Sequence, residues 1–231
     1  VPCDVQFTSA ATHDSFMLAP SYYNHKDIVA LDRAYINYAK FEELTERGVV
    51  YVTKMKKNLK FEVLADYIYQ DPQGLMQDRE QVVVFRKDGI NHVARLITYV
   101  DTQKAKSPKL VSLLTNDFDM SIETIIDIYR QRWQIELLFK QIKQNFPLRY
   151  FYGESENAIK IQIWVTLIAN LLLSVLQSSI ERRWSFSGLA TIVRIVLMYY
   201  LNLERFLNNP DADARNLLLE ASESPPVNTE N

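Results

Sequence analysis

Glycine and cysteine are scarce in this chain of 231 residues, and their scarcity excludes several classes of protein. With five glycines, no G-x-G-x-x-G or G-x-x-x-x-G-K loop can be assembled, which excludes the common nucleotide-binding loops. The single cysteine, Cys3, excludes an internal disulfide framework and a zinc site built on cysteines. The sequence therefore fits a reducing compartment such as the cytoplasm.

Apolar residues make up 48% of the chain and charged residues 23%, a balance that excludes a disordered or low-complexity protein. The length allows one large or two modest domains with a sizeable core. No secretory signal pattern opens the sequence, which starts at Val1 and not at Met, so we expect a portion of a longer protein.

The net charge of −2 disfavours a nucleic-acid-binding protein, but the charges are unevenly distributed. The segment 204–231 has six acidic residues against two arginines and masks a mildly basic remainder. Basic residues gather in the segments 54–60 and 129–149. These clusters are either solvated faces or contacts for an anionic partner, and charge alone does not decide between them.

The first 55 residues alternate strand-like and helix-like patterns. Ile28–Leu31 is a short apolar run typical of a buried strand and ends at Asp32. Tyr38–Arg47 has a helical pattern that stops at Gly48, and Val49–Thr53 has the pattern of the next strand. This segment predicts an α/β fold class.

The rest of the chain divides into a β-rich part and a helical part. Strands are predicted at Gln81–Arg86 and His92–Val100, joined by a turn with the hairpin signal Asp88-Gly89, and at Lys109–Thr115. From Ser121 the pattern is helical, and we expect helices at 121–146, 155–183 and 186–207. We expect the residues from 208 onward, which include three prolines, to form a loose acidic tail.

The uncharged run from Ile161 to Ile180 has the length of a membrane span. Polar residues recur in it at every fourth position, which places one polar stripe along an apolar helix, and these residues are Gln162, Thr166, Asn170 and Ser174. This pattern favours a helix buried mostly in protein over a helix that spans a membrane.

Five polar residues of the helix expected at 121–146 share one face. Their spacings of 3, 4, 4 and 3 residues place them within an arc of roughly 80°, and they are Tyr129, Arg132, Glu136, Lys140 and Lys143. A carboxylate between cations on a helix is commonly a plain ion pair. Asp32 changes this interpretation, because it follows a buried strand, where α/β sheets carry their sites. Two acids on rigid elements can share a divalent metal.

The string Tyr129-x-x-Arg132-x-x-x-Glu136-x-x-x-x-x-x-Lys143 is similar to the Tyr-(2)-Arg-(3)-Glu-(6)-Lys signature of DDE transposases of the insertion-sequence-four family. Upstream, the segments 8–14 (TSAATHD), 29–35 (VALDRAY) and 48–54 (GVVYVTK) resemble the second-aspartate region of that family. The resemblance extends from Val1 to about Arg183.

The resemblance implies a truncated ribonuclease-H-like core with a β-rich insertion and a helical C-terminal region. It divides the chain into a partial core with the second acid at 1–55, and the insertion at 56–116. C-terminal helices that complete the core with the third acid follow at 117–207, before the tail at 208–231.

The resemblance also implies an activity, cleavage and strand transfer at transposon ends. Asp32 would be the second and Glu136 the third acid of an Asp-Asp-Glu triad that holds two Mg²⁺ ions, with Mn²⁺ as the alternative. The working form would be a homodimer in the bacterial cytoplasm, associated with the nucleoid and not with a membrane. The residues expected to bind phosphates of double-stranded DNA are Tyr129, Arg132, Lys143, Arg33 and Lys54.

The first aspartate of the family has no counterpart on an equivalent strand here. Asp4 and Asp14 are candidates, but Asp4 stands in a different strand and Asp14 opens a helix, where an acid is ordinary. With two acids of three, we expect the isolated chain to be inactive. The alternative is a catalytically dead DNA-binding or interaction module, in which the basic helix face binds phosphate without chemistry.

Histidines and aromatic residues have structural interpretations. The three histidines, His13, His25 and His92, lack metal-ligand spacing, so we expect them to be hydrogen-bonded or exposed. Trp133 is expected to pack in the core or at a helix flank. In the resembling family a tryptophan of the insertion can stack a flipped base, but none occurs at 56–116. The aromatic residues there that we interpret as strand residues are Tyr67, Tyr69, Phe85 and Tyr99.

Overall fold

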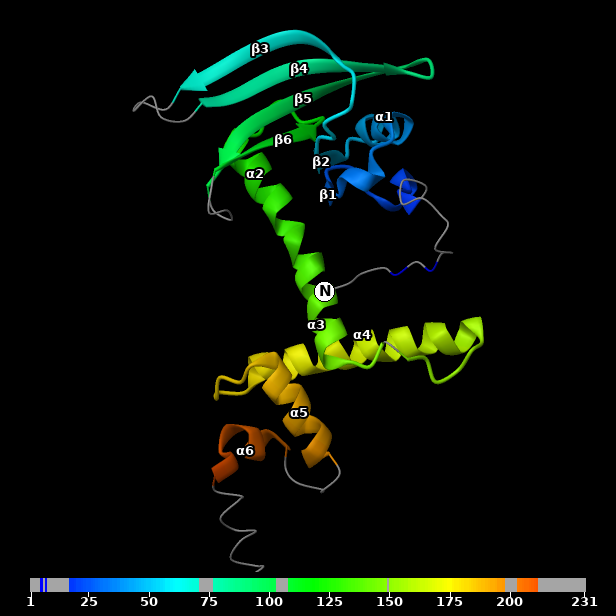
Figure 1. The fold of residues 1–231 in the computed structure, drawn as a ribbon, viewed down its shortest axis with the longest axis vertical. Coiled ribbons are helices and arrows are strands. Elements are labelled where there is room, and N and C mark those ends of the chain that lie inside the picture. Colours follow the sequence, from blue (N-terminus) through cyan, green and yellow to red (C-terminus); the bar gives the residue numbers. More distant parts are fainter. Residues whose placement is uncertain are drawn as a thin grey trace, which may run out of the picture. The chain divides into compact units, whose positions relative to one another are not determined.

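The computed structural model describes residues 5, 7, 17–70, 77–102, 108–148, 150–197 and 203–211. The chain divides into two compact units. We call Thr8–Leu137 the sheet unit, and Val1–Phe7 together with Leu138–Asn231 the helical unit. Figure 1 colours both along the sequence.

The sheet unit is built on a six-stranded mixed sheet (Figure 1). Strands β1 (Ile28–Leu31) and β2 (Val50–Lys54) are parallel and are connected through helix α1 (Tyr38–Glu46). The strand order is β1-β2-β6-β5-β4-β3, and all pairs after β1-β2 are antiparallel. The remaining strands are β3 (Glu62–Gln70), β4 (Gln77–Lys87), β5 (Ile90–Asp101) and β6 (Lys109–Thr115). The β-rich segment thus extends the sheet that the α/β segment begins.

Helices cover both faces of this sheet. Successive residues of a strand point to opposite faces. Tyr51 of β2 packs in one buried cluster with Phe41 of α1, and its neighbour Val52 packs in another with Ile125 of α2 (Ile122–Gln131). The sheet unit is therefore a layered α/β structure, and the predicted α/β class is confirmed.

The hairpin predicted in the β-rich segment is confirmed, with longer arms than the sequence indicated. Its turn residues Asp88 and Gly89 have φ angles of 52° and 78°. A two-residue hairpin turn of type I′ needs positive φ at both positions, which Asp-Gly supplies at little cost. The predicted strands at Ile28–Leu31, Val49–Thr53 and Lys109–Thr115 are also confirmed within one residue.

The outer strand β3, which the sequence analysis did not place, carries a β-bulge. Its pairing with β4 shifts register between Val63 and Ala65, so that Leu64 has no partner residue and is 53% exposed. A bulge bends and twists its strand locally. The aromatic residues Tyr67 and Tyr69 are strand residues here, as predicted, and both are exposed.

The helix expected at 121–146 is interrupted in the structure. α2 ends at Gln131, and α3 (Trp133–Asn145) begins after Arg132. The amide of Arg132 donates to the carbonyl of Tyr129 at 3.2 Å, and the Arg132 carbonyl accepts from Ile135 at 3.2 Å. These i to i+3 bonds tighten the turn into 3₁₀ geometry. The sequence contains no glycine or proline at this point to mark such a break.

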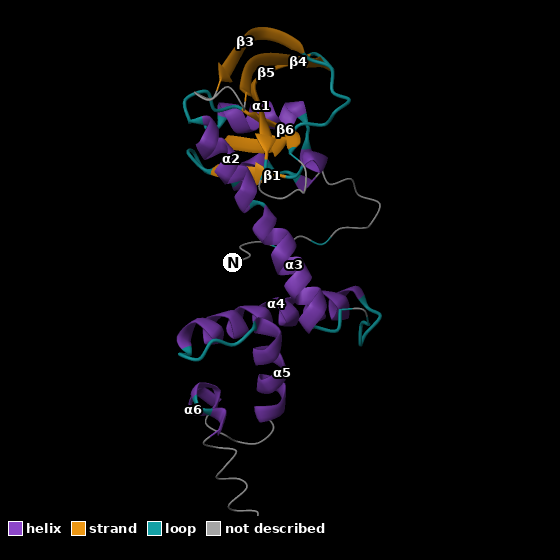
Figure 2. Ribbon diagram, turned by 60° about the vertical axis from the view of Figure 1, so that its left-hand side comes forward, coloured by secondary structure: helices purple, strands orange, loops and turns teal. Residues whose placement is uncertain are grey.

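The described part of the helical unit consists of helices (Figure 2). After the last turns of α3 follow α4 (Glu156–Ser179), α5 (Phe186–Val196) and α6 (Leu203–Asn208). The predicted helix at 155–183 is confirmed but ends four residues earlier. The helix predicted at 186–207 corresponds to α5 and α6, and residues 198–202 between them lie outside the described part of the chain.

The expectation that α4 is mostly buried in protein is wrong for this structure. Its buried residues are the polar Thr166 and Asn170, and Oδ1 of Asn170 accepts a hydrogen bond from Nε2 of Gln141 at 2.9 Å. Apolar side chains such as Val165 and Leu172 are more than half exposed. The polar stripe of α4, and not its apolar face, therefore packs against the neighbouring helix, because it holds the buried residues and this hydrogen bond. Within the described ranges α4 is long and apolar enough to cross a membrane, by length and composition only.

A buried hydrogen-bond network ties α1 to the centre of the sheet. The ring of His92 on β5 contacts the carboxylate of Glu42 through Nδ1, and its Nε2 lies 2.5 Å from the hydroxyl of Tyr51. A carboxylate only accepts, so Nδ1 carries the proton and Nε2 accepts from Tyr51. His92 is thus buried and hydrogen-bonded, as expected for a structural histidine.

We expect this network to make the stability of the chain fall in mild acid. Burial lowers the pKa of His92 below its usual 6.5, although Glu42 opposes the shift. The unfolded chain then binds the proton more readily, so stability is complete above about pH 6.5 and falls as pH drops through that value. Urea unfolding followed by circular dichroism at about pH 7.5 and about pH 5.5 measures this loss. His92→Gln should lower stability at both pH values but reduce the loss between them; an unchanged loss would contradict the assignment.

Candidate active site

Asp32 stands at the carboxyl end of the parallel pair β1 and β2. It follows β1 directly and caps the 3₁₀ turn Arg33–Tyr35, where its Oδ1 accepts from the amide of Ala34 at 2.9 Å. The cap fixes the side chain and leaves Oδ2 directed to other partners. The turn therefore presents one carboxylate oxygen of Asp32 to the space beside the sheet.

The guanidinium of Arg132 brings Asp32 and Glu136 together. Its Nη2 donates to Oε1 of Glu136 at 2.6 Å, and its Nη1 lies 3.6 Å from Oδ2 of Asp32. The first contact is a charge-assisted hydrogen bond, and the second is an ion pair beyond hydrogen-bond length. The side chain of Arg132 is 17% exposed, against 44% for Asp32 and 39% for Glu136. Two acids separated by more than a hundred positions thus share one cation.

The ring of Tyr129 contacts the guanidinium of Arg132. The guanidinium carbon of Arg132 lies 5.4 Å from the centre of the Tyr129 ring, within the range of a cation–π contact. Burial raises the pKa of Tyr129, and the positive charge of Arg132 opposes the shift. Burial disfavours the charge on Arg132, but its contacts with Glu136 and Tyr129 outweigh this and raise its pKa above the usual value. The Nε of Arg132 is buried with no hydrogen-bond partner among the described residues.

Asp32, Tyr129 and Arg132 line a cavity of about 310 Å³ in the sheet unit, which we call the Asp32 cavity; Glu136 is not among its lining residues. Of the residues predicted to bind DNA, Arg33 and Lys54 line it together with Tyr129 and Arg132. The side chains that the sequence analysis did not assign to it are Tyr99, Asp101, Val111, Arg130 and Trp133. Of the two placements predicted for Trp133, the core is excluded because the residue is 43% exposed, and the flank of a helix, here the start of α3, is left. Helical spacing from Tyr129 would have found neither Tyr99 nor Asp101, since both come from β5.

Other predicted residues lie elsewhere. Lys143 belongs to the helical unit, where it lines a separate and largely apolar cavity, so its contact with DNA stays a prediction. His25 is exposed, with Nδ1 at 3.4 Å from the carbonyl of Arg47. Asp4, Asp14 and His13 lie outside the described residues.

The acids of the site fit a divalent cation in kind but not in number. Carboxylate oxygens are the ligands that Mg²⁺ and Mn²⁺ prefer. Asp32 and Glu136 converge on a cationic group, which shows that both can face one positive charge. Asp101 is near Arg130, at 3.7 Å. The described part of the chain contains no group of three or more His, Cys, Asp or Glu side chains placed to hold a metal ion.

Comparison with known proteins assigns the family. Residues 1–172 match the protein family described as the transposase DDE domain. The chain belongs to this family of DDE transposases. It is 32% identical over 150 residues to a protein of Synechocystis sp. (strain ATCC 27184 / PCC 6803 / Kazusa) named as a transposase for insertion sequence element IS4SA. That alignment covers 64% of this chain and 41% of the relative.

A second relative, from Geobacillus stearothermophilus, is named as a transposase for insertion sequence element IS5377. It is 26% identical over 203 residues, which cover 81% of this chain and 49% of the relative. The chain therefore spans less than half the length of these two relatives. DDE transposases in general cut and join DNA with the help of divalent metal ions. The mixed sheet and its helices in this chain are compatible with the fold of a DDE transposase.

We expect the two halves of the Arg132 bridge to differ in strength. Double-mutant cycles with Arg132→Met, Asp32→Asn and Glu136→Gln isolate each pair. The coupling free energy should be about 1 kcal/mol for Arg132 with Glu136 and a few tenths for Arg132 with Asp32, because only the first pair is hydrogen-bonded. Urea unfolding of the wild type, the three single variants and the two double variants measures both values. Equal couplings, or a stronger one with Asp32, would contradict the geometry.

Proposed function

We propose that the whole protein is the transposase of an insertion sequence, which cleaves double-stranded DNA at transposon ends and transfers the strand. The observation that carries the proposal is the convergence of Asp32 and Glu136 on the guanidinium of Arg132, which lines a cavity together with Asp32, Arg33 and Lys54. In this proposal Asp32 is the second and Glu136 the third acid of the DDE triad.

The acids would hold the metal ions, and the cations beside them would hold the DNA. Bound to Asp32 and Glu136, two Mg²⁺ ions, or Mn²⁺ in their place, supply activation of a water or 3′-hydroxyl and stabilisation of the leaving oxygen. Arg132 has to release Oε1 of Glu136 for this, and its planar fork then suits a phosphate oxygen pair. Tyr129 keeps its proton, because burial raises its pKa, so it donates a hydrogen bond and adds no negative charge.

Further features follow from the resemblance of the sequence to the insertion-sequence-four family. We assign the Tyr-Arg-Glu-Lys signature to Tyr129, Arg132, Glu136 and Lys143, and a ribonuclease-H-like core to the elements around β1 and β2. The working form in the proposal is a homodimer that brings two transposon ends together in the bacterial cytoplasm, on the nucleoid. The parallel strands, with an acid at the carboxyl end of β1, support the assignment of the ribonuclease-H-like core.

The proposal predicts a metal-dependent cleavage that needs both acids. In the whole protein, Asp32→Asn or Glu136→Gln should lower the rate of cleavage of end-containing DNA by at least about a hundredfold, because each removes a charge from the metal ligands. EDTA should abolish cleavage, and added Mg²⁺ or Mn²⁺ should restore it. Gel analysis of end-labelled DNA measures both effects.

The control is Glu43→Gln, which removes an exposed carboxylate of α1 that does not line the Asp32 cavity. It should cleave like the wild type. Cleavage that persists in Glu136→Gln would rule out the assigned role of Glu136. DNA binding without any Mg²⁺-dependent cleavage would instead favour a DNA-binding module without catalysis, which the pair of acids described here also permits.

A further inference from the structure

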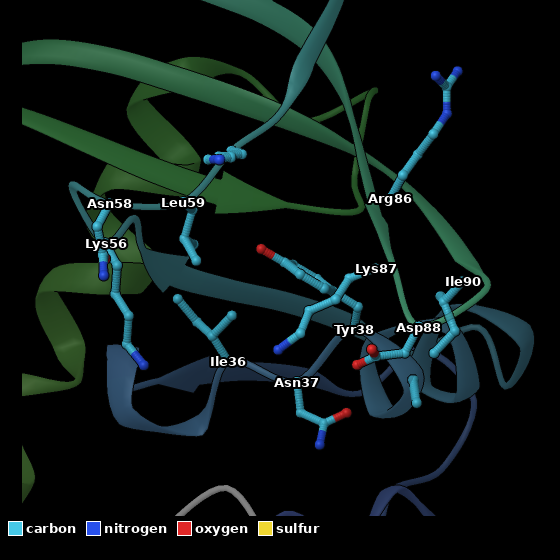
Figure 3. A pocket seen from close by; sticks show the side chains of 12 residues that line it. Ile36, Asn37, Tyr38, Lys56, Asn58, Leu59, Arg86, Lys87, Asp88 and Ile90 are labelled. Carbon is cyan, nitrogen blue, oxygen red and sulfur yellow. The ribbon is translucent and has the colours of Figure 1, made fainter.

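The sheet unit has a second and larger cavity, which we call the Tyr38 cavity. Its volume is about 750 Å³, and it lies between the start of α1, the segment after β2 and the β4–β5 hairpin (Figure 3). Figure 3 shows the amine of Lys87 and the hydroxyl of Tyr38 directed into it, whereas Arg86 extends away. The lining is mixed, with apolar residues such as Ile36 and Leu59 beside the polar ones, and it shares no residue with the lining of the Asp32 cavity.

Positive charge at this cavity is largely uncompensated. Lys56, Lys60 and Lys87 line it, and none of them forms an ion pair with a residue in the described ranges. Asp88 is the single acidic residue of the lining, and Arg86 is paired with Glu62 at 2.6 Å. Unpaired cations around a concave surface concentrate the field and attract anions. The cavity therefore suits an anionic ligand.

Neutral donors complete the lining. The ring of Tyr38 stacks on Phe85, with 4.8 Å between the ring centres, which fixes the direction of its hydroxyl. Burial raises the pKa of Tyr38 to about 12, so the hydroxyl stays protonated and donates. Asn37, Tyr38 and Ala39 at the start of α1 also line the cavity, where the first amides of a helix have no partner within the helix. Amines, a hydroxyl and amides together match phosphate oxygens.

The Tyr38 cavity and the Asp32 cavity use the same two connecting segments. After β1, Asp32 and Arg33 line one cavity, and Ile36 and Asn37 line the other. After β2, Lys54 lines the first and Lys56 the second. Two residues of extended chain span at most about 7 Å. The Tyr38 cavity lies on the α1 side of the sheet and the Asp32 cavity on the α2 side, and both include residues that follow the carboxyl ends of β1 and β2. A DNA strand carries a phosphate about every 3.4 Å along the helix axis, so a strand that passes around this end of the sheet can present phosphates to both cavities.

We propose that the Tyr38 cavity is a second phosphate-binding site, which holds the backbone of the DNA strand that reaches the Asp32 cavity. The inference rests on the proposed function and adds to it a location for DNA outside the acidic site. Lys56, Lys60 and Lys87 bind the phosphates, and Tyr38 donates to a phosphate oxygen. No base edge is read here, so the contact is independent of sequence.

The test compares two double variants of equal charge in the full chain. Lys56→Gln with Lys87→Gln removes two cations of the Tyr38 cavity, and Lys57→Gln with Lys109→Gln removes two exposed cations that line neither cavity. Fluorescence anisotropy with a duplex of arbitrary sequence gives the affinity at several salt concentrations. The cavity variant should bind at least about tenfold more weakly and have a salt slope smaller by about 2, whereas the control should bind nearly as the wild type.

A cavity variant that binds DNA like its control would overturn the inference. Arg132→Gln with Lys54→Gln separates this failure from failure of the proposed function. If that variant binds weakly while the cavity variant does not, the second site alone is refuted. If the wild type binds no duplex, both fail. Thermal denaturation with inorganic pyrophosphate tests the other source of phosphate: protection lost in the cavity variant without any loss of duplex binding would assign the cavity to a small polyphosphate and overturn the proposal.

Discussion

The site depends on a single shared cation, the guanidinium of Arg132. Without it, the partly exposed carboxylates of Asp32 and Glu136 would have no cation between them and would repel each other. The bridge joins the end of β1, an edge strand of the sheet, to the first turn of α3. The tight turn between α2 and α3 lies at the same residue, Arg132.

The shared cation also has a consequence for ion binding. A divalent ion at the two acids competes with Arg132 for Oε1 of Glu136. The guanidinium also repels the ion as long as the guanidinium stays between the acids. A phosphate group that attracts Arg132 removes this competition. Within the proposed function, metal and DNA would therefore favour one another's binding, since each satisfies one half of the same ion pair.

Most of the fold of the sheet unit could be predicted from local patterns. The run Ile28–Leu31, the stop at Gly48 and the Asp88-Gly89 turn each leave a direct mark in the sequence, because each depends on neighbouring residues. The break at Arg132 leaves none, since neither glycine nor proline stands there. The burial of α4 was misjudged for a related reason: helical periodicity shows that polar and apolar sides exist, but not which of them finds a partner.

The site was predictable to the extent that it follows one helix. The helical spacing of Tyr129, Arg132 and Glu136 predicts that they share one face. Asp32 was predicted separately, from its place after a strand. Asp101 and Tyr99 come to the Asp32 cavity through the pairing of β5 with its neighbours, which no spacing rule contains. The Tyr38 cavity likewise joins a helix start to a hairpin far along the chain. The lysines at 54–60 pointed toward it, but their unpaired state depends on three-dimensional neighbours.

The bulge at Leu64 has a protective effect on the outer strand. An edge strand offers a row of free amides and carbonyls that another chain can extend. β3 exposes Val63, Tyr67, Ile68 and Tyr69 beside that row, a combination that invites sheet-to-sheet association. One surplus residue interrupts the regular repeat of donors and acceptors, so a straight incoming strand cannot match both halves of β3 at once. The bulge thus protects an exposed apolar edge strand from edge-to-edge association into fibrils.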